Sequence, residues 1–188
     1  MRVSLIFGCE PLLERWQRFF ESHNGALAHC KWTMPGCLMG MYGKMAAVDE
    51  AQIVEMASCD CDAMMIHFES DSAVDLDKNW DIVLRLIEAL AAPVSIMEGG
   101  EPVGEDWSYG PAHYVTPALV SSIASRLAVV DAQVLESTFD TLDDGSVYPL
   151  FGFEDPRQRE WAMETYGLVV RLFESASSRG QFVIFVVV

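Results

Sequence analysis

The sequence predicts an α+β fold: a single compact domain in which several helices pack on a small mixed sheet. Segments with helical periodicity outnumber segments that look like strands, and the two do not alternate as they would in a doubly wound α/β fold. The chain also ends in an apolar, β-branched segment, Phe182 to Val188, which is typical of a strand covered on both faces. With 188 residues, of which 51% are apolar, the chain suits one ordered domain.

The first residues predict one strand and one helix. Val3 to Phe7 is a short apolar run that Gly8 and Pro11 end. From Leu12 to Glu21, apolar side chains recur at helical spacing, which indicates an amphipathic helix.

Two helices are predicted in the middle of the chain. Asp49 and Gln52 have the spacing of a capping box, so we expect a helix that continues through Ala57. Asp77 is expected to cap the next helix, which ends before Pro93. Its apolar stripe consists of Trp80, Val83, Leu84, Ile87 and Leu90.

Three helices are predicted in the C-terminal half. The pair Thr116-Pro117 opens the first, because proline needs no hydrogen-bonded N–H in the first turn. Asp131 starts a short second helix, and Asp155-Pro156 opens the longest, which ends near Arg179 before Gly180. Its expected buried stripe is Trp161, Leu168, Val169, Leu172, Phe173 and Ala176.

The segment from Gly99 to Pro117 holds the candidate ligand-binding residues. It is rich in glycine, proline, acids and aromatic residues, and we expect a structured loop rather than a core element. His113 could act as a general base or ligand contact beside Glu105 and Asp106, or its ring could simply bond to the loop backbone. A pocket here would be lined by Lys78, Trp80, Glu105, Asp106, Trp107, Tyr109 and His113.

From Met39 onward the chain resembles the YfbM-like family of uncharacterised bacterial proteins, a domain of unknown function. The matching blocks are Met39-Gly40-Met41, Leu76 to Asp81, Gly99 to Pro102, Tyr109 to Ala112, Tyr114 to Pro117 and Val147 to Pro149. The resemblance implies a compact α+β domain over residues 39–188 and supplies no reaction. Residues 1–38 are then an N-terminal extension, or follow a start codon placed too early.

The chain departs from this family pattern after the tryptophan of the second block. Relatives often carry a histidine there and a Leu-Thr-Gly sequence at the end of the same helix. This chain has Asp81 and Ala89-Leu90-Ala91 instead. A catalytic role of that histidine in relatives would therefore not extend to this chain.

The sequence contains no complete metal-binding or nucleotide-binding motif. Asp140, Asp143 and Asp144 lack the alternate spacing of an EF-hand loop, and Cys59 and Cys61 lack a second ligand pair. The sequence has no serine nucleophile elbow, phosphate-binding glycine loop or dinucleotide fingerprint. We therefore predict no metal and no cofactor, and leave an enzymatic role open without favouring it.

The net charge of −16 limits the partners. So acidic a surface repels nucleic acid and anionic membranes, and it suits solubility alone, a basic protein partner or a cationic ligand. An odd number of cysteines in a chain of this size argues against a secreted disulfide framework, so we expect a cytoplasmic protein. The favoured hypothesis is an acidic protein-binding module, such as an immunity protein that neutralises a toxin. The alternative is an enzyme or small-ligand binder with its pocket around Gly99 to Pro117.

Overall fold

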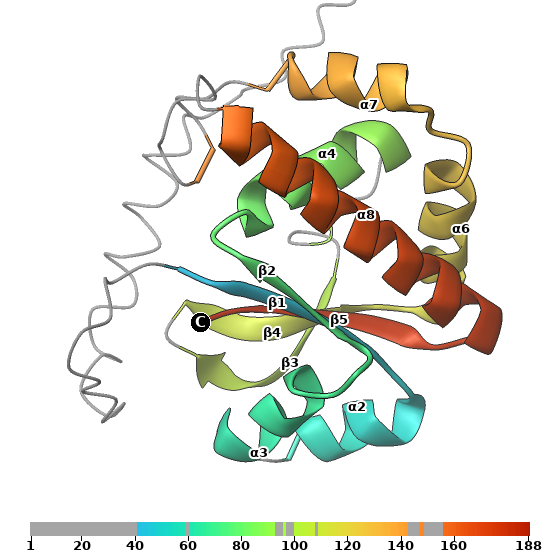
Figure 1. Cartoon of the computed structure of the whole chain (residues 1–188). Helices are drawn as coiled ribbons and strands as arrows, with labels where there is room; N and C mark the ends of the chain where they lie inside the picture. Colours follow the sequence, from blue (N-terminus) through green and yellow to red (C-terminus); the bar gives the residue numbers. More distant parts are fainter. Residues whose placement is uncertain are drawn as a thin grey trace, which may run out of the picture. The chain divides into compact units, whose positions relative to one another are not determined.

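A five-stranded antiparallel sheet forms the centre of the fold (Figure 1). The computed structural model describes residues 41–58, 61–92, 96, 100–107, 109–142, 147–148 and 156–188. Its strands are β1 (Gly43–Val48), β2 (Ala73–Asp77), β3 (Glu101–Trp107), β4 (Gly110–Val115) and β5 (Phe182–Val187), in the order β2-β1-β5-β4-β3. The predicted strand and helix within residues 1–38 lie outside the described residues.

The C-terminal strand β5 is the middle strand of the sheet. Phe185 pairs with Met45 of β1 on one side and with His113 of β4 on the other. Residues 183 to 187 of β5 are all buried. The prediction of an apolar strand covered on both faces is therefore confirmed, and this position removes the aggregation hazard that so apolar a strand would be at a sheet edge.

Helices cover both faces of the sheet (Figure 1). One face is covered by α4 (Trp80–Ala91), α6 (Pro117–Leu127) and α8 (Pro156–Arg179), while α7 (Ala132–Phe139) packs against α4. The other face is covered by α2 (Glu50–Met56), α3 (Cys61–Met65) and the short 3-10 helix η1 (Ile66–Phe68). The α+β fold class is confirmed.

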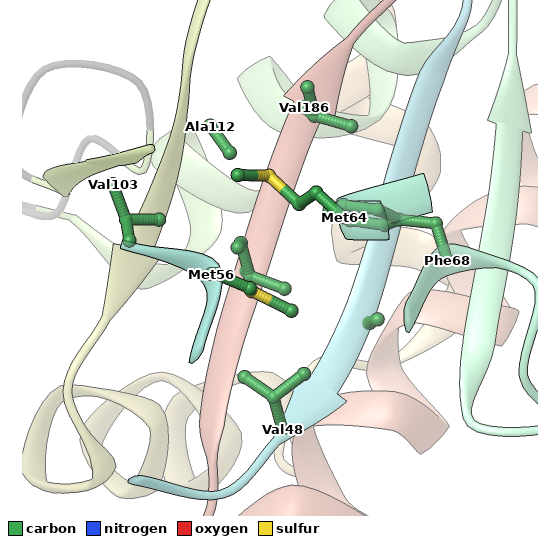
Figure 2. Packing of buried hydrophobic residues seen from close by; sticks show 9 residues of the cluster. Val48, Met56, Met64, Phe68, Val103, Ala112 and Val186 are labelled. Carbon is green, nitrogen blue, oxygen red and sulfur yellow. The ribbon is translucent and has the colours of Figure 1, made fainter. Parts of the chain in front are cut away.

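The smaller helical layer buries its own apolar cluster against the sheet (Figure 2). Met56, Met64 and Phe68 reach from α2, α3 and η1 toward the strands. They pack on residues that alternate along the strands with those facing α4 and α8, as a two-sided sheet requires. The strand residues of this cluster are Ala46, Val48, Val103, Ala112, Ile184 and Val186.

The predicted starts of the helices are largely confirmed. Asp49 and Gln52 form the capping box of α2, Pro117 stands in the first turn of α6, and Asp131 caps α7 through the N–H of Val134. The prediction for α4 was wrong. Its N-cap is Asn79, whereas Asp77 takes a positive φ of 48° at the end of β2.

The longest helix ends where the sequence predicts, but its buried face is rotated slightly. α8 stops at Arg179, and Gly180 has the left-handed φ of 65° expected after a helix. Trp161 is 38% exposed and Leu168 is 43% exposed, so their expected place in the buried stripe was wrong. Thr165 and Tyr166 are buried instead, because the inward stripe is narrower than the set of apolar residues on this helix.

The segment from Gly99 to Pro117 is mostly a hairpin and not a loop. Its residues form β3 and β4, which pair through Glu101 with Tyr114 and Trp107 with Gly110. A register shift between Val103 and Trp107 accommodates the polar and glycine-rich part of β3. All strand pairs among the described residues are antiparallel, so the sheet is not the mixed sheet that we expected.

Candidate functional site

Trp80, one of the predicted site residues, is the centre of an aromatic cluster at the start of α4. Its indole is 1% exposed and stacks on Tyr148, with the ring centroids 5.8 Å apart. The centroid of the Trp80 ring also lies 6.2 Å from the centroid of the Phe185 ring. A Cβ on Gly43 would overlap the Trp80 side chain, so the glycine leaves the space that the tryptophan fills. Such full burial suits a core anchor better than a ligand contact.

Asp81, which follows Trp80, connects three segments of the chain. Its carboxylate is almost fully buried and accepts a hydrogen bond of 2.9 Å from the backbone N–H of Tyr148. It also pairs with the guanidinium of Arg85 at 3.2 Å. Tyr148 in turn accepts a hydrogen bond from the N–H of Met41 through its hydroxyl at 3.0 Å. Asp81 therefore performs a structural task here.

Asn79 and Lys78 lie beside this cluster. The side chain of Asn79 is fully buried, and its Oδ1 is 3.4 Å from the Nε2 of Gln158 on α8. Its Nδ2 has no hydrogen-bond partner among the described residues. The Nζ of Lys78 lies 5.5 Å from the centre of the Tyr42 ring, which is within the range of a cation–π contact.

His113 faces the same side of the sheet as Trp80. Because His113 and Phe185 are paired directly across β4 and β5, their side chains leave the sheet on one face. Phe185 therefore stands between His113 and Trp80. The Nδ1 of His113 lies 3.4 Å from the carbonyl oxygen of Gly100. This contact agrees with the interpretation in which the histidine ring bonds to the backbone of its own segment.

The other hairpin candidates lie elsewhere. Glu105 and Asp106 are exposed on β3, and Tyr109 is partly buried in the turn that leads to β4. Gly104, just before them, has a φ of +78° and lies against Met64 and the carbonyl oxygen of Met56. This part of β3 therefore adjoins α2 and α3. The backbone of Trp107 belongs to β3, while its side chain is outside the description.

The seven predicted residues thus fall into separate groups instead of lining one pocket. Lys78 follows β2, an edge strand, whereas Glu105 and Asp106 lie on β3, the opposite edge. Four strand spacings, or roughly 19 Å, separate those edges. Sequence reasoning missed Tyr148, Asp81 and Gly43, because their contacts join segments that are distant along the chain.

A strongly acidic layer covers the other face of the sheet. The stretch from Asp49 to Asp75 contains no lysine or arginine, and its acids are Asp49, Glu50, Glu55, Asp60, Asp62, Glu69, Asp71 and Asp75. Those of them whose side chains are described are exposed. The same layer exposes Val54 of α2 by 68% and Ile66 of η1 by 67%. We call residues 49–75, together with the adjoining Glu105 and Asp106, the acidic layer.

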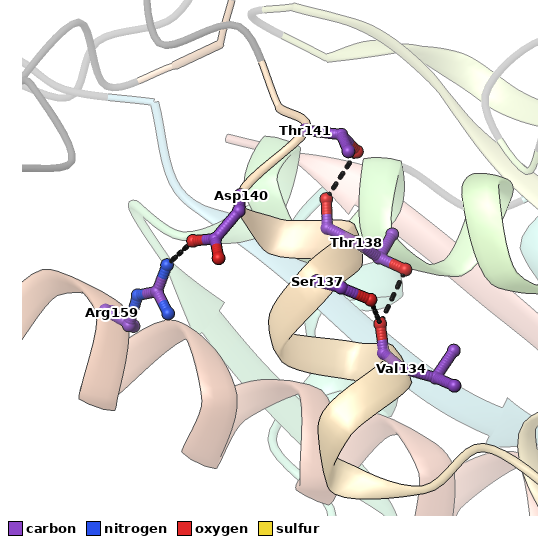
Figure 3. Close-up of polar contacts among 6 residues, drawn as sticks. All are labelled: Val134, Ser137, Thr138, Asp140, Thr141 and Arg159. Atoms are coloured by element: carbon purple, nitrogen blue, oxygen red, sulfur yellow. Dashed lines mark hydrogen bonds and ion pairs between the residues drawn. The ribbon is translucent and has the colours of Figure 1, made fainter.

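Asp140 is the C-cap residue of α7. It forms an ion pair with Arg159 of α8 at the end of α7 (Figure 3). The same guanidinium lies 4.7 Å from the centre of the Phe139 ring, so Arg159 connects α7 to α8. Asp143, Asp144 and Cys59 lie outside the described residues, as does the side chain of Cys61. Within the part of the chain that the structure describes, no group of three or more His, Cys, Asp or Glu residues could hold a metal ion.

No single helix of the described residues is long and apolar enough to cross a membrane. By length and composition alone, α6 and α7 together reach that threshold, but they are bent by 103° relative to each other. Both helices have buried apolar residues inside the fold, as core helices do.

The comparison with protein families decides what kind of domain this is. The model of a domain of unknown function, DUF1877, matches residues 39–186. The chain belongs to this family. The match begins where the resemblance to YfbM-like proteins begins in the sequence, and it includes the strands and helices described above except for the last residue of β5, Val187.

One solved structure supports the fold. It is described as a protein of unknown function, YfbM, from Escherichia coli, and it is similar to this DUF1877 chain with a TM-score of 0.54 and 18% identity. The similarity covers 78% of this chain and 99% of that one. Among curated proteins, none matches the chain significantly. At this identity the likeness shows the fold alone.

Proposed function

We propose that this DUF1877 chain is a protein-binding module that presents its acidic layer to a basic protein, in the manner of an immunity protein. The observation that carries the proposal is the concentration of acids in the acidic layer. Residues 49–75 hold eight acids and no lysine or arginine, while α8, on the other side of the sheet, carries four arginines and three glutamates. A face of one sign steers a partner of the opposite sign and speeds its association.

The exposed apolar residues in the acidic layer support the same proposal. Val54 and Ile66 stand among carboxylates, and each is more than half exposed. In protein interfaces, apolar side chains at the centre of a patch contribute affinity, whereas the charged rim contributes mainly orientation and association rate. A partner with basic residues around an apolar centre fits this pattern. The odd cysteine count favours the cytoplasm as the compartment.

The alternative, a small-ligand or catalytic site around the hairpin, has less support. Its predicted residues divide between two edges of the sheet, and Trp80 is buried. His113 is the member best placed for such a role, because it is partly exposed on the face that bears Phe185.

The test uses two variants with equal changes in charge. In the first, Glu50, Glu55 and Glu69 of the acidic layer are changed to Gln; in the second, Glu136, Glu160 and Glu174 of α7 and α8 are changed to Gln. All six are exposed. Each variant and the unchanged chain are used to capture proteins from an extract of the native host at low and at high salt.

We expect a captured protein with a basic surface to be lost from the first variant and retained by the second. Capture by the unchanged chain should weaken as salt rises, because exposed charges are screened beyond about 8 Å at physiological ionic strength. Equal loss from both variants, or capture that is independent of salt, would contradict the proposal.

A further inference from the structure

α8 carries apolar side chains that remain exposed in the described part of the structure. Trp161 and Leu168 are both more than a third exposed, and they are seven residues apart, so they lie on one side of the helix. The buried residues of α8, from Ala162 to Ala176, face the sheet and α6, and Trp161 and Leu168 lie about a quarter turn away from them, toward the outward side. Two large apolar residues aligned along one exposed stripe indicate a surface that meets another molecule.

Gly167 lies on the side of α8 away from the sheet, and nothing in the described part of the chain explains it. A Cβ at this position would meet only the Nη1 of Arg171, at an ordinary 3.7 Å. Its φ is not positive, unlike that of Gly180. A glycine in the interior of a helix lowers stability relative to alanine, so its presence calls for a reason outside the helix. Close approach of a second backbone is one such reason.

The charged residues on this face indicate which kind of partner it can bind. Glu164 stands three residues before Gly167, and Arg171 stands three residues after Leu168. Neither forms an ion pair within the described part of the chain. If a second α8 runs antiparallel with its twofold axis between Gly167 and Leu168, Glu164 of each copy faces Arg171 of the other. The surface is then complementary to itself, as a twofold interface must be.

The overall charge points to the same face. The chain has a net charge of −16, so two copies repel each other over most of their surface. α8 has four arginines against three glutamates, so a second copy meets less repulsion there than on the acidic layer. Its 24 residues give a contact line of roughly 36 Å, which is long enough to support an interface of ordinary size.

From these observations we propose that α8 is the interface of a homodimer in which two copies pack antiparallel across Gly167 and Leu168. Leu168 of each copy contacts Leu168 of the other, the two Gly167 residues bring the backbones close, and Glu164 and Arg171 form two equivalent ion pairs. The interface leaves the acidic layer, on the opposite face of the sheet, free to bind its partner.

The test first measures the mass of the full chain in solution. It then measures the dimer dissociation constant of variants in which the charges of Glu164 and Arg171 are reversed. Sedimentation equilibrium at up to about 100 µM should give twice the 20.9 kDa of one chain. Glu164→Arg alone and Arg171→Glu alone each place like charges opposite each other and should raise the dimer dissociation constant at least tenfold. The double variant Glu164→Arg with Arg171→Glu should restore it to within about threefold.

A second pair of variants separates the apolar contact from general effects. Leu168→Lys should give a monomer, whereas Val129→Lys, at a residue 82% exposed outside α8, should leave the dimer intact. Gly167→Ala should weaken the dimer while raising the melting temperature of the monomer. The proposal is overturned by a chain that is monomeric throughout the concentration range, by a double variant that stays as weak as the single variants, or by Val129→Lys acting like Leu168→Lys.

Discussion

Gly43 of β1 lies directly against Trp80 of α4, so closely that a Cβ on the glycine would overlap the indole. This contact sets the distance between the sheet and the helix that covers it, and it places Trp80 between Tyr148 and Phe185. The contact also explains why position 43 is a glycine. The φ of Gly43 is not positive, so the backbone conformation alone does not require a glycine there.

Gly43→Ala is expected to destabilise the fold by overpacking. The added methyl group must displace Trp80 or part the strand from the helix, which costs about 1–3 kcal/mol in a tightly packed core. Urea unfolding of the variant measures this loss. A free energy of unfolding equal to that of the unchanged chain would show that the helix moves aside freely.

The two tryptophans on helices are expected to respond differently to truncation. Trp80→Ala removes a buried side chain and should cost about 3–5 kcal/mol. Trp161→Ala removes one that is more than a third exposed and should cost less than about 1 kcal/mol in the monomer. Denaturant unfolding at low protein concentration compares them directly, and similar losses for both would refute the assignment of Trp161 to the surface.

Asp81→Ala should detach the segment around Tyr148 from α4. The backbone N–H of Tyr148 and the guanidinium of Arg85 both lose their carboxylate partner, and a lost bond to a charged group costs about 1.5–3 kcal/mol. Arg85→Ala leaves the bond to Tyr148 in place and should cost less. Trp80 fluorescence reports whether its stacking on Tyr148 persists, and an unchanged spectrum in Asp81→Ala would argue against this connection.

The sequence predicted helices better than strands, for identifiable reasons. Capping residues and proline mark where α2, α6 and α7 begin, and these are local signals. The strands β1 and β2 were not predicted: β1 is short and buried along most of its length, so it shows no alternation. β3 and β4 contain glycine, proline and acids, which suggested a loop, but β4 pairs with β5 and β3 pairs with β4 at the edge of the sheet.

In the candidate site, too, the features that depend on neighbouring residues were predicted, and the contacts between distant residues were not. Trp80 was placed correctly in an apolar stripe, because helical periodicity is local. The bond between Asp81 and Tyr148 joins residues 67 positions apart, and one sequence gives no signal for it. The acidic layer was not predicted, although residues 49–75 contain no lysine or arginine. Only the fold shows that this stretch covers one face of the sheet.

Two glycines near the C-terminus are expected to respond in opposite ways to alanine. Gly167→Ala should raise the free energy of unfolding of the monomer by about 0.5–1 kcal/mol, since the site is helical and a Cβ fits there. Gly180→Ala should lower it by about 1–2 kcal/mol, because a φ of 65° is unfavourable for a residue with a side chain even where space is open. Thermal unfolding at dilute concentration distinguishes them, and a gain from both would contradict the backbone argument.

Tyr166 of α8 should make the fold less stable at high pH. Burial raises the pKa of its hydroxyl to about 12, and that hydroxyl has no hydrogen-bond partner among the described residues. In the unfolded chain the group ionises with a pKa near 10. Between those two values the unfolded state loses the proton while the folded state keeps it, so stability is intact below pH 10 and falls as pH rises toward 12.

The variant Tyr166→Phe tests this dependence. It retains the packing of the ring, so its stability at neutral pH should equal or exceed that of the unchanged chain, since a buried hydroxyl without a partner opposes folding. Above about pH 10 its free energy of unfolding should fall less steeply than that of the unchanged chain. Denaturant unfolding at a series of pH values measures both slopes, and parallel curves would show that Tyr166 ionises equally in the folded and unfolded states.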